Sequence, residues 1–477
     1  MLVQSALVAL GATLAAAVTP LEVQGSQLVN TKNGNAFQIV GMAYQIGGSA
    51  GYDPSHGKDP LSNGDICKRD AALMQQLGVN TIRVYNLDPN LNHDECASIF
   101  NAAGIYMLID VNSPLEGESL RSDNPKGSYT TSYVNRTFAV AEAFKSYPNT
   151  LAFFAGNENI NNAETGANVP PYVRAVVRDL KNYIKKQADR AIPVGYSAAD
   201  VRSVLQDTYN YFTCAIDGDE NDMSISDIFA LNSYSWCGDS TFQESGYDQL
   251  VDMFKNGTVP IFYSEYGCNT PSPRVFTEIA TIYGSQMTGV WSGGVVYEFA
   301  EEPNRYGLAT VNDDNSVDLL ADYRTLQSQY AKVDFTKVQN VKAAAAKKTT
   351  PPTCKSDLIT EKGFASDFKL PDVPKGVQDL IDNGISPKPN AKIVSISDWT
   401  VTHEVRDVDG KKLSDLSVKA LSDDESNAPG SSSSSSGSSN GTENAAPGLA
   451  PQGPASVAGM IIPTIVALSA ALGFSLI

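Results

Sequence analysis

Eight short apolar segments recur between residues 19 and 340, and this repeat constrains the fold more than any other feature of the chain. Each segment is followed by a polar loop and a stretch with helical character. The first begins at residue 37 and the seventh at residue 260, so one repeat takes about 37 residues, enough for a strand and its crossover helix. The segments are Phe37–Met42, Thr81–Tyr85, Tyr106–Val111, Leu151–Gly156, Pro193–Ser197, Ile228–Asn232, Pro260–Ser264 and Gly294–Tyr297.

Glycine marks the ends of the first intervening helices. The stretch 65–77 is closed by Gly78, and the stretch 94–103 is closed by Gly104. Strands that alternate with helices form parallel sheets, and eight such units predict an α/β fold, a closed (β/α)8 barrel or TIM barrel. In such barrels the reactive groups lie at the carboxyl ends of the strands.

The two ends of the chain predict export and a membrane anchor. The apolar run Ala6–Val18 ends in small residues and predicts a signal peptide over residues 1–17. From Val457 onward the chain is apolar and uncharged, and it follows a small triplet and a polar spacer, which is the order of a glycosylphosphatidylinositol (GPI) signal. We expect Asn444 to carry the anchor on the outer face of the cell membrane and residues 445–477 to be removed. A tail-anchored transmembrane helix is the alternative.

Composition shifts divide the rest of the chain. Residues 19–340 form the predicted barrel, and an Ala-, Lys- and Pro-containing stretch over 341–353 predicts a linker. Residues 354–424 are too few and too charged for a large core, so they predict a small appendage. Residues 425–444 are rich in serine and glycine and predict a flexible stalk. Sequons for N-glycosylation lie at Asn135, Asn256 and Asn440.

The charge balance excludes one class of partner. Lys and Arg number 35 against 53 Asp and Glu, which gives a formal net charge of −18 at pH 7. Nucleic acid requires a basic face, so it is not expected as a partner, whereas an uncharged substrate suits this balance. Only three histidines are present, which disfavours a metal site built on histidine. We expect no metal, no cofactor and a monomeric protein.

Six cysteines in an oxidising compartment allow up to three disulfide bonds. Of the 15 possible pairings, barrel topology favours one. In this pairing, one bond joins the starts of two neighbouring helices and a second joins two neighbouring loops. By elimination, the third bond ties the appendage to the barrel. A mixture of free and paired thiols is the alternative. The expected pairs are Cys67–Cys96, Cys237–Cys268 and Cys214–Cys354.

Two of the predicted strands deliver a glutamate at their carboxyl ends. Glu158 follows the fourth strand within Asn-Glu-Asn, and Glu265 follows the seventh within Glu-Tyr-Gly. Retaining glycosidases need two carboxyl groups about 5–5.5 Å apart, one protonated and one ionised. We therefore expect these two residues to be catalytic, and two surface glutamates are the alternative. Glu298, Glu301 and Glu302 cluster in one acidic loop, which favours an acceptor-side or structural role for them.

The other strand ends carry tyrosine, amide and carboxylate side chains. Aromatic faces suit the C–H surfaces of a sugar, and amides and carboxylates suit its hydroxyl groups. Packing at the barrel rim is the alternative for each tyrosine, and a structural hydrogen bond is the alternative for Asp110. The candidate binding residues are Gln45, Tyr85, Asp110, Asp200, Arg202, Tyr234 and Tyr297.

Several short motifs give the chain a resemblance to a known family. They are Arg83-Val84-Tyr85, Gly156-Asn157-Glu158, Val194-Gly195-Tyr196-Ser197, Tyr263-Ser264-Glu265-Tyr266-Gly267-Cys268 and Arg305-Tyr306-Gly307-Leu308. With these motifs, residues 20–355 resemble the fungal GPI-anchored β-1,3-glucanosyltransferases, glycoside hydrolase family 72. Only Cys354 follows the barrel, so the chain is similar to the short subgroup that lacks a cysteine-rich carbohydrate-binding module.

The resemblance implies a role for each candidate. Glu158 is implied to be the acid/base, Glu265 the nucleophile, and Asn157 the ligand of the donor sugar's 2-hydroxyl. The implied glucan-binding residues are Tyr85, Asp200, Arg202 and Tyr297, with Gln45 and Tyr234 close by.

The implied reaction cleaves an internal β-1,3 bond of one glucan. It then joins the new reducing end to the non-reducing end of a second glucan, which lengthens cell-wall glucan. Two alternatives remain open: a β-1,3-endoglucanase that transfers to water, and a non-catalytic cell-wall binding protein.

Overall fold

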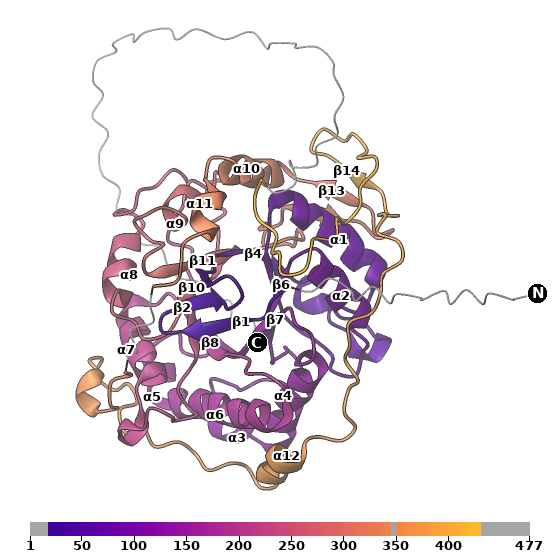
Figure 1. The fold of residues 1–477 in the computed structure, drawn as a ribbon. Coiled ribbons are helices and arrows are strands. Elements are labelled where there is room, and N and C mark those ends of the chain that lie inside the picture. The colour runs from indigo at the N-terminus through magenta and orange to yellow at the C-terminus, as the bar shows by residue number, and fades with distance from the viewer. Residues whose placement is uncertain (1–17, 345–349, 431–477) are drawn as a thin grey trace, which may run out of the picture.

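The computed structural model describes residues 18–344 and 350–430 (Figure 1). Its centre is a closed barrel of parallel strands in the order β10-β11-β4-β5-β6-β7-β8-β9, so the predicted (β/α)8 fold is confirmed. Each of the eight predicted segments overlaps one barrel strand. The barrel strands are β4 (Ile39–Tyr44), β5 (Thr81–Val84), β6 (Tyr106–Asp110), β7 (Thr150–Asn157), β8 (Val194–Ala199), β9 (Ile228–Asn232), β10 (Ile261–Tyr266) and β11 (Trp291–Val296).

Helices surround the barrel, and α1 shows how the sequence sets their ends. The Asn63 side chain accepts hydrogen bonds from the backbone N–H groups of Asp65 and Ile66 at 3.1 and 3.2 Å, and Gly78 ends the helix at φ 81°. The helices are α1 (Gly64–Leu77), α2 (Asp94–Ala102), α3 (Pro125–Ser128), α4 (Thr131–Phe144), α5 (Ala163–Asn168), α6 (Pro170–Gln187), α7 (Arg202–Thr213), α8 (Tyr247–Phe254), α9 (Ile279–Ile282), α10 (Ala321–Tyr330), α11 (Phe335–Gln339) and α12 (Val377–Asn383).

A small N-terminal sheet closes the end of the barrel where the strands begin. Leu21 and Leu28 of this sheet pack in one buried cluster with Leu108 and Phe154 from inside the barrel. The interior is therefore a packed core, which leaves the opposite end, where the strands finish, as the place for a site. The strands of this sheet are β1 (Leu21–Gln24), β2 (Gln27–Asn30) and β3 (Asn35–Ala36).

Residues 350–430 form a belt that runs around the outside of the barrel (Figure 1, orange to yellow). The belt starts beside α7, where the backbone N–H of Cys354 donates to the carbonyl of Ala215 at 2.8 Å. A little further along, Phe368 stacks on Tyr211 with ring centroids 4.9 Å apart. These contacts hold the start of the belt against the helices of the barrel.

The middle of the belt crosses several helices in turn. α12 packs on α4 and α6, and β14 (Val405–Arg406) then pairs with β13 (Val317–Leu319), which itself pairs with β12 (Ala309–Val311). The sequence predicts a small appendage over residues 354–424. In the structure this segment packs along the outside of the barrel, and part of it folds back on itself: the Val401 N–H donates to the carbonyl of Leu416 at 2.9 Å, and Thr400 pairs with Ser417.

The belt ends at the face of the barrel where the strands begin. Asn427 is 1% exposed, and its side chain donates to the carbonyl oxygens of Gln75 and Val79 at 3.1 and 2.9 Å. Its backbone N–H donates to Gly104 at 2.9 Å. The first residues of the predicted stalk over 425–444 are therefore packed on the barrel as far as the structure describes them.

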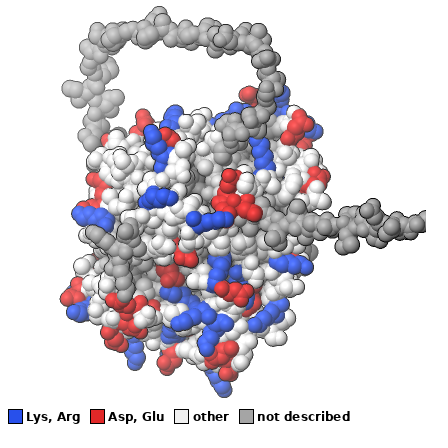
Figure 2. Space-filling view, viewed as in Figure 1, with Lys and Arg blue, Asp and Glu red and all other residues white. Residues whose placement is uncertain are grey.

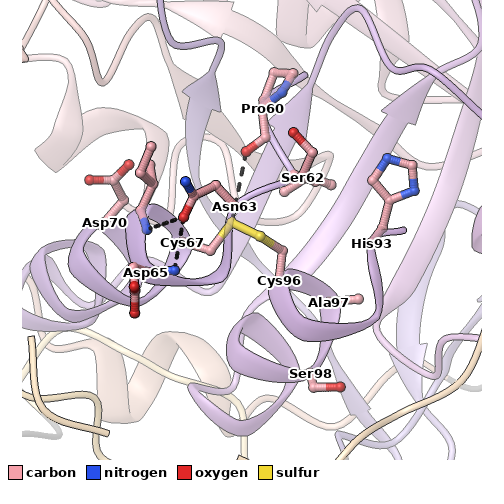
Figure 3. The surroundings of a disulfide bond; sticks show 12 residues. Pro60, Ser62, Asn63, Asp65, Cys67, Asp70, His93, Cys96, Ala97 and Ser98 are labelled. Carbon is pink, nitrogen blue, oxygen red and sulfur yellow. Dashed lines mark hydrogen bonds between the residues drawn. A yellow bond between two sulfur atoms is a disulfide. The ribbon is translucent and has the colours of Figure 1, made fainter. Parts of the chain in front are cut away.

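Three disulfide bonds join the same cysteines that the topology predicts. Figure 3 shows Cys67–Cys96, which ties the start of α1 to α2. Cys237–Cys268 joins the loops after β9 and β10. Cys214–Cys354 joins the end of α7 to the belt across a sequence separation of 140 residues.

Some predictions fall outside the described residues. These are the signal peptide over 1–17, the sequon Asn440, the anchor site Asn444 and the segment 445–477. Asn135 and Asn256 are exposed. Within residues 18–344 and 350–430, no helix combines the length and the apolar composition that crossing a membrane requires. Figure 2 shows acidic and basic side chains interspersed on the face in view.

Candidate active site

A buried arginine, Arg83 on β5, organises the carboxyl end of the barrel. Its guanidinium forms a two-point ion pair with Asp110 on β6, Nε to Oδ2 at 2.9 Å and Nη2 to Oδ1 at 3.1 Å. Asp110 is 4% exposed, and this ion pair supplies the structural hydrogen bond that is the alternative for this residue, while its sugar-binding role stays a prediction. The other N–H groups donate to Asn157 at 2.9 Å, Asn232 at 3.2 Å and Glu265 at 3.1 Å.

Two asparagines extend this network. Asn157 Oδ1 accepts from Arg83 Nη2, Ser197 Oγ and Asn232 Nδ2 at 2.8–3.0 Å. Since all three partners are donors, the side-chain oxygen of Asn157 faces them. Asn157 is exposed, and its Nδ2 is available to a ligand. Asn232 Oδ1 accepts in the same way from Arg83 Nη1 and the hydroxyl of Ser264, at 3.2 and 2.8 Å.

Glu158 lies directly after β7 in an unusual backbone conformation. Its φ is 51°, in the left-handed region, and its N–H donates to the carbonyl of Ser197 at 2.9 Å. A non-glycine residue persists there only where its surroundings impose it, and such residues gather at functional sites. This turn brings Glu158 Oε1 to 2.7 Å from Asn232 Nδ2.

Glu265 on β10 accepts three hydrogen bonds from charged or hydroxyl donors. Oε1 receives Arg83 Nη1 at 3.1 Å and the Tyr85 hydroxyl at 2.9 Å, and Oε2 receives the Tyr234 hydroxyl at 2.7 Å. Burial raises the pKa of Glu265 to about 7, and the charge of Glu158 adds to this shift. Arg83 and the two hydroxyls oppose it by stabilising the anion.

The two glutamates meet the same polar network. Glu158 binds Asn232, Glu265 binds Arg83, and Arg83 Nη1 donates to Asn232 Oδ1 at 3.2 Å. One carboxyl group is half-exposed and the other is buried, so the pair combines a group open to proton exchange with a group that is fixed in place.

Three tyrosines form an aromatic trio beside Glu265. Tyr234, Tyr297 and Tyr306 pack edge to face, with centroid distances of 6.3, 5.4 and 5.5 Å, and all three are half-buried. The trio thus offers ring surface at the end of the barrel where both carboxyl groups lie, which suits the C–H face of a sugar.

The remaining candidates lie at the same end of the barrel but bind their own neighbours. Arg202 pairs with Asp200 through Nη2 and Oδ2 at 3.0 Å, and Ser233 Oγ donates to Asp200 Oδ2 at 2.6 Å. Gln45, after β4, contacts Ser49 at 3.5 Å. Within the described structure, none of the three predicted residues hydrogen-bonds Glu158 or Glu265.

Several residues of the network are absent from the sequence-based prediction. Arg83 could have been found, because a charged residue in the strand Thr-Ile-Arg-Val can be buried only if it is paired. Asn232 ends the sixth predicted strand, and Ser197, Ser264 and Tyr306 stand in the motifs of the family resemblance, but only the structure shows their place in the network. Among residues 18–344 and 350–430, His, Cys, Asp and Glu form no group of three that is placed to hold a metal ion.

A (β/α)8 barrel with two carboxyl groups at the ends of its fourth and seventh strands defines an enzyme of glycosidic bonds. The family model described as glucanosyltransferase, glycoside hydrolase family 72, matches residues 10–334. The chain belongs to this family of transglycosylating enzymes.

Known relatives agree with this assignment. The chain is 52% identical over 425 residues to the 1,3-β-glucanosyltransferase gel2 of Aspergillus fumigatus, covering 89% of this chain and 87% of the relative. It is 42% identical over 366 residues to the 1,3-β-glucanosyltransferase GAS4 of Saccharomyces cerevisiae, covering 76% and 77% of the two chains. A structure of S. cerevisiae Gas2p with laminaritetraose and laminaripentaose superposes with a TM-score of 0.65 at 34% identity, covering 75% of each chain.

Proposed function

We propose that this protein is a retaining 1,3-β-glucanosyltransferase in which Glu265 is the nucleophile and Glu158 the acid/base. The observation that carries the assignment is the contrast between the two carboxyl groups. Glu265 is buried and fixed by Arg83, Tyr85 and Tyr234, as a nucleophile must be, whereas Glu158 is half-exposed and can exchange protons.

The reaction has two displacements. Glu265 attacks the anomeric carbon of a β-1,3-linked glucosyl unit while Glu158 protonates the departing oxygen, which leaves a glucan covalently bound to Glu265. Glu158 then removes the proton from the 3-hydroxyl at the non-reducing end of a second glucan. That oxygen attacks the anomeric carbon, Glu265 leaves, and the product is a longer β-1,3-glucan.

The substrate contacts follow from the same geometry. We assign the Nδ2 of Asn157, which has no hydrogen-bond partner among the described residues, to the 2-hydroxyl of the donor sugar, and we assign Tyr85, which donates to Glu265, to the same sugar. The named oligosaccharides of Gas2p are β-1,3-linked glucose chains, which supports β-1,3-glucan as donor and acceptor. We assign Asp200, Arg202 and Gln45 to more distant sugars, since they lie on the rim.

A product-length assay tests the function. We expect one reduced laminari-oligosaccharide of a single length to give products both longer and shorter than itself. Longer products require transfer to a second sugar, because water as the acceptor gives only shorter ones. Chromatographic separation of the products over time measures this. Only shorter products would make the protein an endoglucanase, and no products at all would make it a binding protein.

A pH profile tests the role of Glu265. The Tyr234→Phe variant removes the donor to Oε2, so the pKa of Glu265 should rise above the value of about 7. Because the nucleophile must be ionised, the acidic limb of the kcat/KM profile should move to higher pH, by about one unit for a charge-assisted hydrogen bond of about 1.5 kcal/mol.

The matched control for this profile is Tyr306→Phe. Tyr306 belongs to the same trio, but no hydrogen bond joins its hydroxyl to Glu265 in the described structure. The acidic limb of the kcat/KM profile of Tyr306→Phe should stay within about 0.3 pH units of the wild-type limb. A shift to lower pH in Tyr234→Phe, or equal shifts in both variants, would contradict the assignment of Glu265.

We also propose that the enzyme acts at the outer cell surface. Residues 1–17 would direct export, and Asn444 would carry a GPI anchor after removal of 445–477, which supports action in the cell wall. Asn135 and Asn256 are exposed and accessible to N-glycosylation. Release of the protein from membranes by a phospholipase specific for GPI anchors tests this proposal.

A further inference from the structure

A carboxyl group that the proposed reaction does not use lies behind the aromatic trio. Glu298 follows Tyr297 directly after β11, and it is 1% exposed. Its Oε1 accepts a hydrogen bond from Asn304 Nδ2 at 3.1 Å. Its Oε2 is buried and has no hydrogen-bond partner of normal geometry within the described residues. An ionised carboxylate in this place would lose most of its solvation without full compensation.

The surrounding charges also favour the neutral form of Glu298. Burial raises its pKa to about 8. The carboxylates of Glu302 and Glu265 add to the shift, whereas the hydrogen bonds from Asn304 and Tyr297 oppose it. The guanidinium of Arg274 is already engaged, since it pairs with Asp322 at 2.6 Å. The titratable and charged groups that face Glu298 are Glu265 from β10, Tyr297, Glu302 and Tyr306 from its own loop, and Arg274, which binds the carbonyls of Tyr297 and Tyr306.

Glu298 connects the two ends of the loop that carries the rings. Its N–H donates to the carbonyl of Tyr306 at 3.0 Å, and its own carbonyl accepts from Leu308 at 3.2 Å. Its side chain binds Asn304 in the same loop. The backbone of Glu298 thus joins the two ends of the loop, and its buried side chain binds Asn304, which lies between Tyr297 and Tyr306 in the chain.

We propose that Glu298 is a positioning residue that acts as a neutral carboxylic acid and holds Tyr297 and Tyr306 where they bind the acceptor sugar. This inference rests on the proposed transferase function. Tyr234 joins the trio to Glu265, so a sugar on these rings lies beside the intermediate. Ionisation of Glu298 places another negative charge near Glu265 and Glu302, and the loop must move to solvate it.

The ratio of transfer to hydrolysis isolates this effect. Both products come from the same intermediate on Glu265, and both need Glu158 as the base. Titration of either catalytic residue therefore cancels in the ratio, which reports only how well an acceptor sugar competes with water. A change that merely lowers the amount of folded enzyme leaves the ratio constant.

The test uses the full-length enzyme with one reduced laminari-oligosaccharide as donor and acceptor. In wild type, the ratio should fall about tenfold between pH 6 and pH 9, which is the loss of the protonated form for a group with a pKa of about 8. Glu298→Gln is neutral at every pH and keeps the acceptor for Asn304, so its ratio should stay high across this range. Glu298→Ala should have a low ratio at every pH.

The matched control is Glu301→Gln, in the same loop. Glu301 accepts from the Gly307 N–H at 2.7 Å, and glutamine preserves that acceptor, so the wild-type pH dependence of the ratio should remain. A ratio that falls equally in Glu298→Gln, or that does not change with pH in wild type, overturns the inference. Absence of longer products from wild type at all pH values would instead overturn the proposed function.

Discussion

Replacing Glu265 by glutamine is expected to lower kcat on β-1,3-glucan at least about a thousandfold, because no covalent intermediate forms without the carboxylate. Replacing Glu158 by glutamine should lower it about 10²–10⁴-fold, the usual contribution of a general acid/base. Initial rates of product formation measure both losses. Glu301→Gln is the control and should keep its activity, since among the described residues the side chain of Glu301 accepts only from the Gly307 N–H, an acceptor that glutamine preserves.

Azide separates the two roles. In Glu265→Ala, azide replaces the missing nucleophile and attacks the anomeric carbon once, with inversion, while Glu158 protonates the leaving oxygen. The product is an α-glucosyl azide. In Glu158→Ala, an aryl laminari-oligoside first forms the intermediate on Glu265, and azide then displaces it. The two inversions give a β-glucosyl azide.

The anomeric coupling in the proton NMR spectrum distinguishes these products. The opposite pairing of variant and anomer would exchange the roles of the two glutamates. Failure of azide to restore either variant, with both correctly folded, would contradict catalysis by this pair.

Removing the Cys214–Cys354 disulfide is expected to cause the largest loss of stability among the three bridges. It closes a loop of 140 residues, so its removal as Cys214→Ala with Cys354→Ala should cost about 4–5 kcal/mol of unfolding free energy in the loop-entropy account. Arg174 adds to the effect, because its Nη1 lies 3.3 and 3.4 Å from the two sulfur atoms. Denaturant unfolding of the oxidised proteins measures the loss.

The matched control removes Cys237–Cys268, which closes 31 residues and is less buried. Its cost should be about 1 kcal/mol smaller on loop length alone. Hydrogen exchange should also report faster exchange along residues 354–370 only in the Cys214 and Cys354 double variant. Equal losses with no local change in exchange would show that the bridge does not hold the belt.

Local sequence signals are strong for the barrel. The strand at 106–110 starts with four apolar residues, and Gly78 and Gly104 mark where helices end, so element type follows from residues a few positions apart. The two glutamates could be placed for the same reason, since strand ends in a parallel barrel meet at one face.

The rest of the site depends on contacts between residues far apart in the chain. Arg83 and Glu265 are separated by 182 positions, and only the barrel register brings them together. Asp110 can be recognised in the sequence as a polar strand end, but its ion pair with Arg83 cannot. The course of the belt is equally hidden, because single contacts such as Phe364 against Gly166 fix it without any periodic pattern.

The belt leaves the barrel at the end opposite to the chemistry. Asn427 binds Gly104, and Pro429 lies against Gly78, just before β5 and β6 begin. Strands of about six residues place the carboxyl groups of Glu158 and Glu265 about 20 Å away, at the other end. If the chain beyond residue 430 tethers the protein to a surface, the end of the barrel that carries Glu158 and Glu265 would therefore face away from that surface. Glucan located away from that surface would reach the active site directly. Glucan close to the surface would have to pass around the outside of the barrel first.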